Sequence, residues 1–316
     1  METVLIAGGT GLVGTALSKL LLLNGYTVIL LSRSIPPLPE ASPGNEEGPT
    51  LRKAYWDPAK KQIDKAAIEQ ADYIINLAGA GVAEKRWTAA RKKEIAESRV
   101  QSGQLVVKAL TEIPNKVKAV INASAIGWYG ANAKDSTPTA FTEVDPADKG
   151  FLGRTCNQWE ESIKPIAGLQ KRLVILRIGI VLSNEGGALA EFKKPLRVGV
   201  AAILGNGRQI ISWIYIEDLC RLFMFALQQQ GLSGIYNAVA PEPISNAALT
   251  IQLAKKKNGR FFIPVQVPAI ALKMILGEMS IEVLKSAVVS SRKIESSGFE
   301  FLYPSINKAL EVLCAF

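Results

Sequence analysis

The glycine-rich stretch "AGGTGLVGTAL" at residues 7–17 constrains the fold of this 316-residue chain more than any other segment. It follows a short β-branched, apolar run at residues 3–7 and opens a run with apolar residues at helical spacing, so it lies at a strand-to-helix turn. A helix N-terminus presents unpaired N–H groups and the positive end of the helix dipole, and the glycines Gly8, Gly11 and Gly14 are expected to leave clearance for a pyrophosphate there. The residues expected to contact a dinucleotide are Gly8, Thr10, Gly11, Leu12 and Val13.

Strands and helices alternate beyond this turn. Apolar strands are predicted at residues 27–33, 53–57, 72–81, 118–130 and 172–182, with helices at about 88–110 and from 151 onward. This alternation predicts an α/β protein with a Rossmann-type, doubly wound parallel sheet and a ligand at the carboxyl ends of its strands.

The alternation of predicted strands and helices becomes less regular after residue 183, which suggests a second domain. We expect residues 1–183 to form an NADP-binding Rossmann domain to which residues 213–240 contribute. Residues 184–212 and 241–316 are then expected to form a smaller C-terminal α+β domain on the substrate side.

Residue usage excludes several kinds of chemistry. The chain has no histidine and only three scattered cysteines, so we expect neither a metal site nor a disulfide framework. The lack of histidine also excludes Ser-His-Asp and Cys-His hydrolysis. Acid and base catalysis therefore depends on Tyr, Lys, Asp, Glu or Cys.

The net charge and the hydropathy limit the kinds of partner that this chain is expected to bind. The net charge is +9, but the basic residues are spread along the chain. Runs of basic residues, such as Arg91-Lys92-Lys93, are interpreted as solvated helix faces, with a basic cleft for a phosphorylated cofactor as the alternative. We therefore expect a small-molecule substrate and no nucleic acid. No apolar run approaches the ~20 residues of a membrane span, and the chain enters its first strand at once, so we expect no membrane partner and a cytoplasmic location. A homodimer is left open.

The end of the second predicted strand indicates which dinucleotide is bound. NAD-preferring turns carry an acidic residue there, which accepts hydrogen bonds from the ribose 2′-hydroxyl and repels a 2′-phosphate. This chain has Ser32-Arg33 and no acidic residue before Glu40. A hydroxyl and a guanidinium suit a phosphate, so NADP is favoured, with an ordinary solvated arginine as the alternative.

Several motifs together resemble one family. They are "GGTGLVG" at 8–14, "NLAGAGV" at 76–82, "ESRVQSGQLV" at 97–106, "SAIGWYG" at 124–130, "LRIGIVLSNEGGAL", "WIYIEDL", "YNAVAPEPISN", "LGEMS" and the terminal "SGFEFLYPSINKAL". With these, the whole chain resembles the extended short-chain dehydrogenase/reductases of the NAD-dependent epimerase/dehydratase superfamily. Within them it is similar to an atypical, epimerase-like branch with an extra C-terminal domain of unknown function. The resemblance implies a Rossmann-type fold and a bound nicotinamide dinucleotide.

The resemblance also implies further cofactor contacts. The small residues at the end of the fourth predicted strand are expected to pack along the adenosine and its ribose. Glu94 and Arg99 on the next helix, and the backbone of Ile180 after the sixth strand, complete the expected set. On their sequence alone, the two helical residues read equally well as surface charges. The strand-end residues that are expected to pack along the adenosine and its ribose are Leu77, Ala78 and Gly79.

The family's catalytic pair is missing. Its Tyr-x-x-x-Lys motif would fall on Leu152 and Cys156, in the helix "GFLGRTCNQWEES". Ser124 takes the place of the family's serine or threonine, and Tyr129 follows it closely, so these two are the candidates for proton transfer. Tyr129 reads equally well as a packing residue. Cys156 lacks a histidine to activate it as a nucleophile.

Two functions therefore stay open. One is an NADP(H)-dependent epimerase or oxidoreductase acting on a small polar substrate, for which family analogy suggests a sugar derivative. The other is a catalytically impaired dinucleotide-binding sensor or interaction protein, a role that suits the cell-division-inhibitor-like members of this branch.

Overall fold

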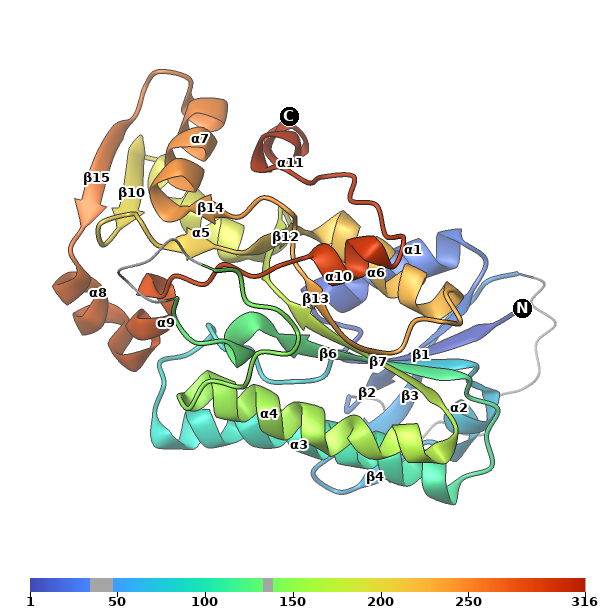
Figure 1. The fold of residues 1–316 in the computed structure, drawn as a ribbon. Helices are drawn as coiled ribbons and strands as arrows, with labels where there is room; N and C mark the ends of the chain where they lie inside the picture. Colours follow the sequence, from blue (N-terminus) through green and yellow to red (C-terminus); the bar gives the residue numbers. More distant parts are fainter. Residues whose placement is uncertain (35–47, 133–138, 316) are drawn as a thin grey trace.

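A mostly parallel sheet of eight strands forms the centre of the molecule (Figure 1). The structure is a computed structural model that describes residues 1–34, 48–132 and 139–315. In spatial order the strands are β13 (Gly234–Ala238), β7 (Arg172–Ile178), β6 (Ala119–Ala125), β5 (Tyr73–Asn76), β1 (Thr3–Ala7), β2 (Thr27–Ser32), β3 (Leu51–Asp57) and β4 (Gln62–Ile63). Only β4 pairs antiparallel to its neighbour in this sheet. The Rossmann-type, doubly wound fold is confirmed.

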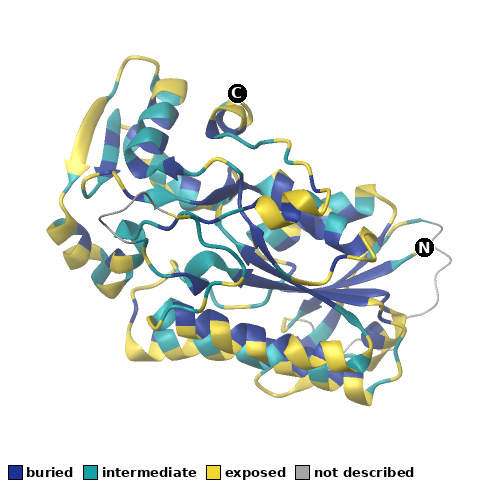
Figure 2. Ribbon diagram, viewed as in Figure 1, coloured by how far each residue is buried: buried dark blue, intermediate teal, exposed yellow. Residues whose placement is uncertain are grey.

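Helices cover both faces of this sheet. α1 (Leu12–Leu23) and α6 (Ile216–Gln228) lie on one face, and α2 (Lys65–Gln70), α3 (Ala89–Glu112) and α4 (Phe151–Ile163) lie on the other (Figure 1). The two apolar cores follow from the alternation of side chains along each strand. On β1, Val4 and Ile6 join the core under α1 and α6, whereas Leu5 and Ala7 join the core under α2, α3 and α4. The sheet is therefore buried from both sides, as Figure 2 shows.

The predicted sixth strand, 172–182, is in fact two strands. β7 ends at Ile178, and after Gly179 the chain continues as β8 (Ile180–Ser183) in a separate three-stranded sheet with β12 (Trp213–Tyr215) and β9 (Gly186–Gly187). At the junction the Gly179 N–H still donates to Ala238 of β13, whereas the Ile180 N–H donates to Ser212. A Cβ at Gly179 would lie 2.8 Å from the Ser212 carbonyl oxygen. The change of partner requires glycine, which an apolar pattern does not reveal.

The rest of the chain builds smaller elements beside the carboxyl edge of the large sheet (Figure 1). One further helix, α10 (Arg292–Ser296), lies beside β13 on the face that α6 covers, and its Ile294 joins the core under α1 and α6. The smaller elements are α5 (Ala188–Leu196), β10 (Val200–Leu204), β11 (Ile210–Ile211), β14 (Ile244–Ser245), α7 (Asn246–Asn258), β15 (Ile263–Val267), α8 (Ala269–Leu276), α9 (Ser280–Leu284) and α11 (Ile306–Leu313). Their core includes Leu189, Trp213, Leu249 and Leu310. The division into two domains stays a prediction. Within the described residues, no helix is long and apolar enough to cross a membrane.

Candidate functional site

The three glycines of the first turn have different structural roles. Gly8 has φ +78°, and a Cβ there would lie 2.8 Å from the Leu77 carbonyl carbon, so this glycine lets β1 and β5 end close together. A Cβ at Gly14 would lie 2.5 Å from Cα of Gly9, so Gly14 lets α1 pack on the turn. Gly11 is exposed, and its nearest non-neighbour atom would be 3.5 Å away. The expectation of clearance for a ligand therefore fits Gly11 and is wrong for Gly8 and Gly14, whose added atoms would meet protein.

The N-terminus of α1 is open to an anion. Gly11 is its N-cap residue, no side chain caps the helix, and its first turn carries no acidic residue. Unpaired N–H groups and the helix dipole therefore act together at this point. Thr10 is exposed, and Leu12 and Val13 are half-buried. The turn accordingly fits a dinucleotide pyrophosphate.

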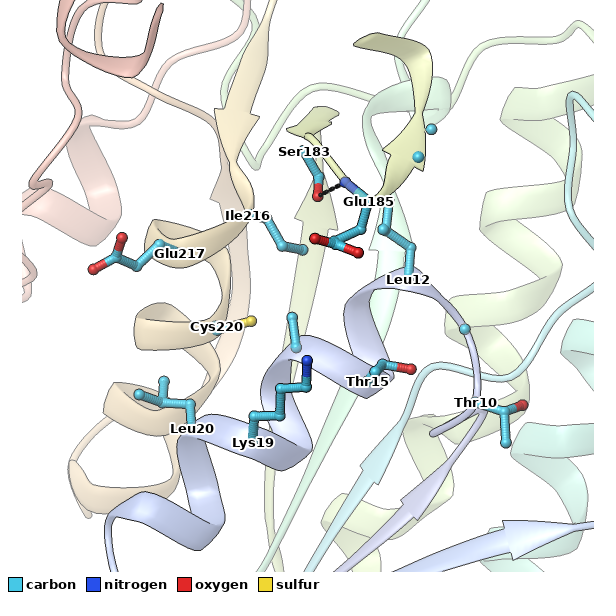
Figure 3. A pocket seen from close by; sticks show the side chains of 14 residues that line it. Thr10, Leu12, Thr15, Lys19, Leu20, Ser183, Glu185, Ile216, Glu217 and Cys220 are labelled. Carbon is cyan, nitrogen blue, oxygen red and sulfur yellow. Dashed lines mark hydrogen bonds between the residues drawn. The ribbon is translucent and has the colours of Figure 1, made fainter. Parts of the chain in front are cut away.

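A cavity of about 550 Å³ adjoins this turn (Figure 3). It lies between α1, α6 and the turn from β8 to β9, and it begins at Thr10, Gly11 and Leu12. Sequence reasoning missed its other lining residues, although the spacing of Leu12, Thr15 and Lys19 places them on one face of α1. These further residues are Thr15, Ala16, Lys19, Leu20, Ser183, Glu185, Gly186, Gly187, Ile216, Glu217 and Cys220.

The end of β2 faces the start of α3. Ser32 is half-buried, its Oγ accepts a hydrogen bond from the Ser34 N–H at 3.2 Å, and Arg33 is exposed. The pKa of Glu94 lies below its usual value, first because Arg91 donates a hydrogen bond to it, and the charges of Arg91, Lys85 and, least, Arg33 lower it further. The structure thus brings Ser32, Arg33 and Glu94 to one region at the carboxyl edge of the sheet.

Arg91 is not on a solvated face. Its side chain is only 6% exposed, with Nη1 2.8 Å from Glu94 and Nη2 2.9 Å from Glu84. Nη2 also donates to the backbone oxygen of Gly81 at 2.5 Å. Arg91 therefore fixes the loop after β5, and the prediction that it forms part of a solvated run is wrong, because helix spacing turns it toward that loop.

Arg99 supports the same loop from the next turns of α3. Its Nη1 donates to the backbone oxygen of Ala80 at 2.9 Å, and its guanidinium carbon lies 5.0 Å from the centre of the Trp159 ring. Burial lowers the pKa of Arg99. A Cβ on Gly79 would lie 2.9 Å from Cγ of Arg99, so the arginine fills the space that this glycine leaves.

The strand-end residues Leu77, Ala78 and Gly79 are half-buried or exposed and follow β5 directly, beside the first turn. The Leu77 N–H donates to Ala7 at the end of β1. Ile180 is 40% exposed at the start of β8. These residues reach the carboxyl edge as expected, and their contact with a cofactor stays a prediction.

A buried ionic network occupies the end of β6. Ser124 Oγ donates to Oε1 of Glu160 at 2.7 Å, and Arg177 binds both oxygens of Glu160, through Nε at 2.9 Å and Nη2 at 3.0 Å. All three side chains are almost fully buried. The Arg177 guanidinium also lies 3.6 Å from the centre of the Trp128 ring. Sequence reasoning missed this pair, although an arginine inside the apolar strand "RLVILRI" signals a buried partner.

Tyr129 belongs to the same network. It follows the short 3-10 helix η1 (Ile126–Trp128), its side chain is fully buried, and its hydroxyl donates to Oδ1 of Asn237 at 2.7 Å. The same hydroxyl oxygen accepts a hydrogen bond from Arg177 Nη1 at 3.0 Å. Burial raises the pKa of Tyr129 to about 12, although Arg177 opposes this rise. A proton-transfer role for Ser124 and Tyr129 stays a prediction, and in this arrangement both hydroxyl hydrogens are committed to protein acceptors.

The positions of the missing Tyr-Lys pair hold no reactive group. Leu152 lies on α4 beside Gly127, and Cys156 is buried on the same helix. Burial raises the pKa of the Cys156 thiol to about 12, and the charge of Glu160 adds to this. A thiol of this kind stays protonated near neutral pH and is a poor nucleophile.

Comparisons with known proteins find similar sequences over nearly the whole chain. The family model of the NAD dependent epimerase/dehydratase family matches residues 4–238, and a domain of unknown function, DUF1731, matches residues 267–313. An epimerase family protein of Mycobacterium bovis is 34% identical over 310 residues, covering 97% of this chain and 96% of its own length. One of Staphylococcus aureus is 33% identical over 313 residues, 99% of each chain.

Two solved structures of similar proteins have the same fold as this chain. A human epimerase family protein, crystallised with NADPH, superposes with a TM-score of 0.84 at 29% identity, covering 99% of both chains. A nucleoside-diphosphate sugar epimerase from Corynebacterium glutamicum has a TM-score of 0.74 at 28% identity, covering 99% of this chain and 57% of its own. With its doubly wound sheet, its glycine turn and a match over most of its length, this chain belongs to the NAD dependent epimerase/dehydratase family.

Proposed function

We propose that this protein binds NADP(H) in preference to NAD(H) and acts as an oxidoreductase or epimerase on a small polar substrate. The observation that carries the proposal is the open N-terminus of α1 beside a second strand that ends in Ser32-Arg33 without an acidic residue. The human relative solved with NADPH supports the choice, while other similar structures contain NAD.

The residues present fit the dinucleotide. Gly11, Leu12 and Val13 would hold the pyrophosphate through backbone N–H groups, and Ser32 and Arg33 would hold the 2′-phosphate. Leu77, Ala78 and Gly79 would pack along the adenosine side, with Glu94 and Arg99 reaching from α3 and the Ile180 backbone from β8. The bound nicotinamide would supply a hydride acceptor or donor.

Titration of the full chain with NADPH and NADH, followed by tryptophan fluorescence, tests this proposal. We expect NADPH to bind more tightly and Arg33→Ala to weaken NADPH about 10- to 100-fold, the effect of losing a charge-assisted contact of roughly 1.5–3 kcal/mol. NADH affinity should be unchanged in this variant. The matched control Arg260→Ala removes an exposed charge elsewhere and should change neither affinity. Equal affinities for both dinucleotides, or unchanged NADPH binding by Arg33→Ala, would show that the proposal is wrong.

The end of β6 favours a second candidate, a dinucleotide-binding sensor or interaction protein without turnover. Leu152 and Cys156 replace the family's acid–base pair, and the hydroxyls of Ser124 and Tyr129 are buried in hydrogen bonds. A screen of aldehydes, ketones and nucleotide sugars with NADPH separates the two candidates. Turnover of any one compound supports the enzyme. NADPH binding with no turnover across these classes supports the sensor.

A further inference from the structure

The cavity beside the first turn extends beyond the part that a dinucleotide would occupy (Figure 3). Gly11 lies at one end of the cavity, and Lys19 and Leu20 of α1 line the other end. Since an α-helix rises about 1.5 Å per residue, Lys19 lies about 12 Å along the axis of α1 from Gly11. A pyrophosphate bound at the N-terminus of α1 does not reach so far. This far end of the cavity therefore takes no part in the proposed function.

Two side chains of opposite charge are directed into the cavity. Figure 3 shows the Lys19 ammonium, from α1, and the Glu185 carboxylate, from the turn between β8 and β9, pointing into the space between them. Across the described residues, neither charged group takes part in an ion pair or a hydrogen bond. The hydrogen bond that Glu185 makes comes from its backbone N–H, which donates to Ser183 Oγ at 3.1 Å. Both residues are exposed, so both charges are accessible to a molecule from solvent.

The third charged residue of the lining, Glu217 of α6, does not add to this pair. Its Oε2 accepts a hydrogen bond from the Tyr303 hydroxyl at 3.0 Å, and Figure 3 shows its carboxylate directed away from the cavity. Cys220 adds no charge either, because burial raises the pKa of its thiol to about 12. The cavity thus presents one positive and one negative charge.

The wall near these two charges is apolar. Ala16 and Leu20 of α1 line the cavity on one side, and Ile216 and Cys220 of α6 line it on the other. The volume of about 550 Å³ lies within the range of about 300–1,000 Å³ that is typical of small-molecule sites. A ligand with only one kind of charge would be repelled by one of the two charged groups of the cavity. A ligand that matches the lining therefore carries both charges beside an aliphatic part.

We propose that this cavity binds a small zwitterion, an α-amino acid with an aliphatic side chain, at a site separate from that of the dinucleotide. The carboxylate of the amino acid would bind Lys19, and its ammonium would bind Glu185. Its side chain would lie against Ala16, Leu20 and Ile216. The inference goes beyond the proposed function and does not depend on it.

Isothermal titration calorimetry of the full chain with L-leucine tests the proposal, with L-valine and L-methionine as shorter and longer alternatives. We expect binding both without NADPH and at saturating NADPH, because the two sites are separate. Two analogues of leucine test the charges. 4-Methylpentanoate lacks the ammonium and 3-methylbutylamine lacks the carboxylate, so each loses one charge-assisted contact and should bind at least ~10-fold more weakly.

Two substitutions test the charged groups of the cavity. Lys19→Gln removes the partner of the carboxylate and Glu185→Gln removes the partner of the ammonium, so each should weaken leucine binding at least ~10-fold. Lys308→Gln and Glu311→Gln are the matched controls, because both residues are exposed on α11 and do not line the cavity. The controls should bind leucine like the unchanged chain. All four variants should keep its NADPH affinity, and circular dichroism should show them folded.

The proposal is overturned if none of the three amino acids binds at millimolar concentration, or if a single-charge analogue binds as tightly as L-leucine. It is also overturned if Lys19→Gln and Glu185→Gln behave like their controls. Displacement of leucine by NADPH would overturn it as well, because the whole cavity would then belong to the dinucleotide site. Leucine binding by a chain that does not bind NADPH would support this site and contradict the proposed function alone.

Discussion

The end of β1 and the end of β6 lie on the same edge of one sheet, yet their polar groups are used in opposite ways. At the end of β1 the N–H groups of α1 have no side-chain cap, and Gly11 is exposed. At the end of β6, Ser124 and Tyr129 donate to Glu160 and Asn237 inside the protein. The end of β1 is open, whereas the end of β6 is closed by the buried ion pair of Arg177 and Glu160. The two strand ends therefore differ in what they offer a ligand: the first presents N–H groups without a cap, and the second presents side chains that already bond to protein.

Breaking the ion pair at the end of β6 should have the largest effect. Glu160→Gln leaves the fully buried Arg177 without its counter-charge, and we expect a loss of about 3–5 kcal/mol in the free energy of unfolding. Urea unfolding measures this loss. Glu161→Gln, at an exposed neighbour, is the control and should change stability little. A loss below about 1 kcal/mol would show that the network does not hold this strand end.

Substitutions at two glycines of the first turn should have different effects, one on NADPH binding and the other on stability. Gly11→Val should weaken NADPH binding at least ~100-fold and leave the melting temperature nearly unchanged, because its side chain would point to the pyrophosphate and not to protein. Gly14→Ala should instead lower stability by about 1–3 kcal/mol, because its Cβ would meet the backbone of Gly9. Fluorescence titration and thermal unfolding measure the two effects. Full NADPH affinity in a folded Gly11→Val variant would mean that the turn is only structural.

Tyr129→Phe tests what the tyrosine does. If its hydroxyl is structural, this change should cost about 1–3 kcal/mol of stability, because Asn237 Oδ1 and Arg177 Nη1 lose a partner, and it should leave any NADPH-dependent turnover unchanged. Ser124→Ala provides the second measurement at the same strand end. A Tyr129→Phe variant that keeps its stability and loses turnover would instead assign the hydroxyl to proton transfer.

The effect expected to be smallest near neutral pH is a pH dependence of stability, which develops only at alkaline pH. Burial raises the pKa of Tyr129 from 10.0 to about 12 and that of Cys156 from 9.0 to about 12. The unfolded chain therefore releases these protons first, so their contribution is complete below about pH 9 and is lost as the pH rises toward about 12. Each group adds a slope of at most about 1.4 kcal/mol per pH unit. Urea unfolding at several pH values should show this fall, and Tyr129→Phe should reduce it between about pH 10 and 12. A flat profile for the unchanged chain would contradict the burial of these groups.

Sequence patterns predicted the sheet well because local periodicity and buried strands coincide in a Rossmann-type fold. They also predicted the glycine turn, because a strand, three glycines and a helix in that order are a local signal. They missed the switch at Gly179, since apolar residues on both sides hide a change of partner. They also missed the pairing of Glu160 with Arg177, whose two members are brought together only by the packing of α4 on the sheet. The sequence signals that Arg177 needs a buried partner, but it does not show which residue that partner is.

The direct passage from β7 into β8 at Gly179 has a consequence for how the molecule unfolds. One residue separates a strand of the large sheet from a strand of the three-stranded sheet, and each side is hydrogen-bonded to a different partner. If either sheet opens at this point, the backbone of the other sheet is displaced as well, because no loop separates the two strands. Although two family models divide the sequence, the two sheets should lose their amide protection together, as one cooperative unit.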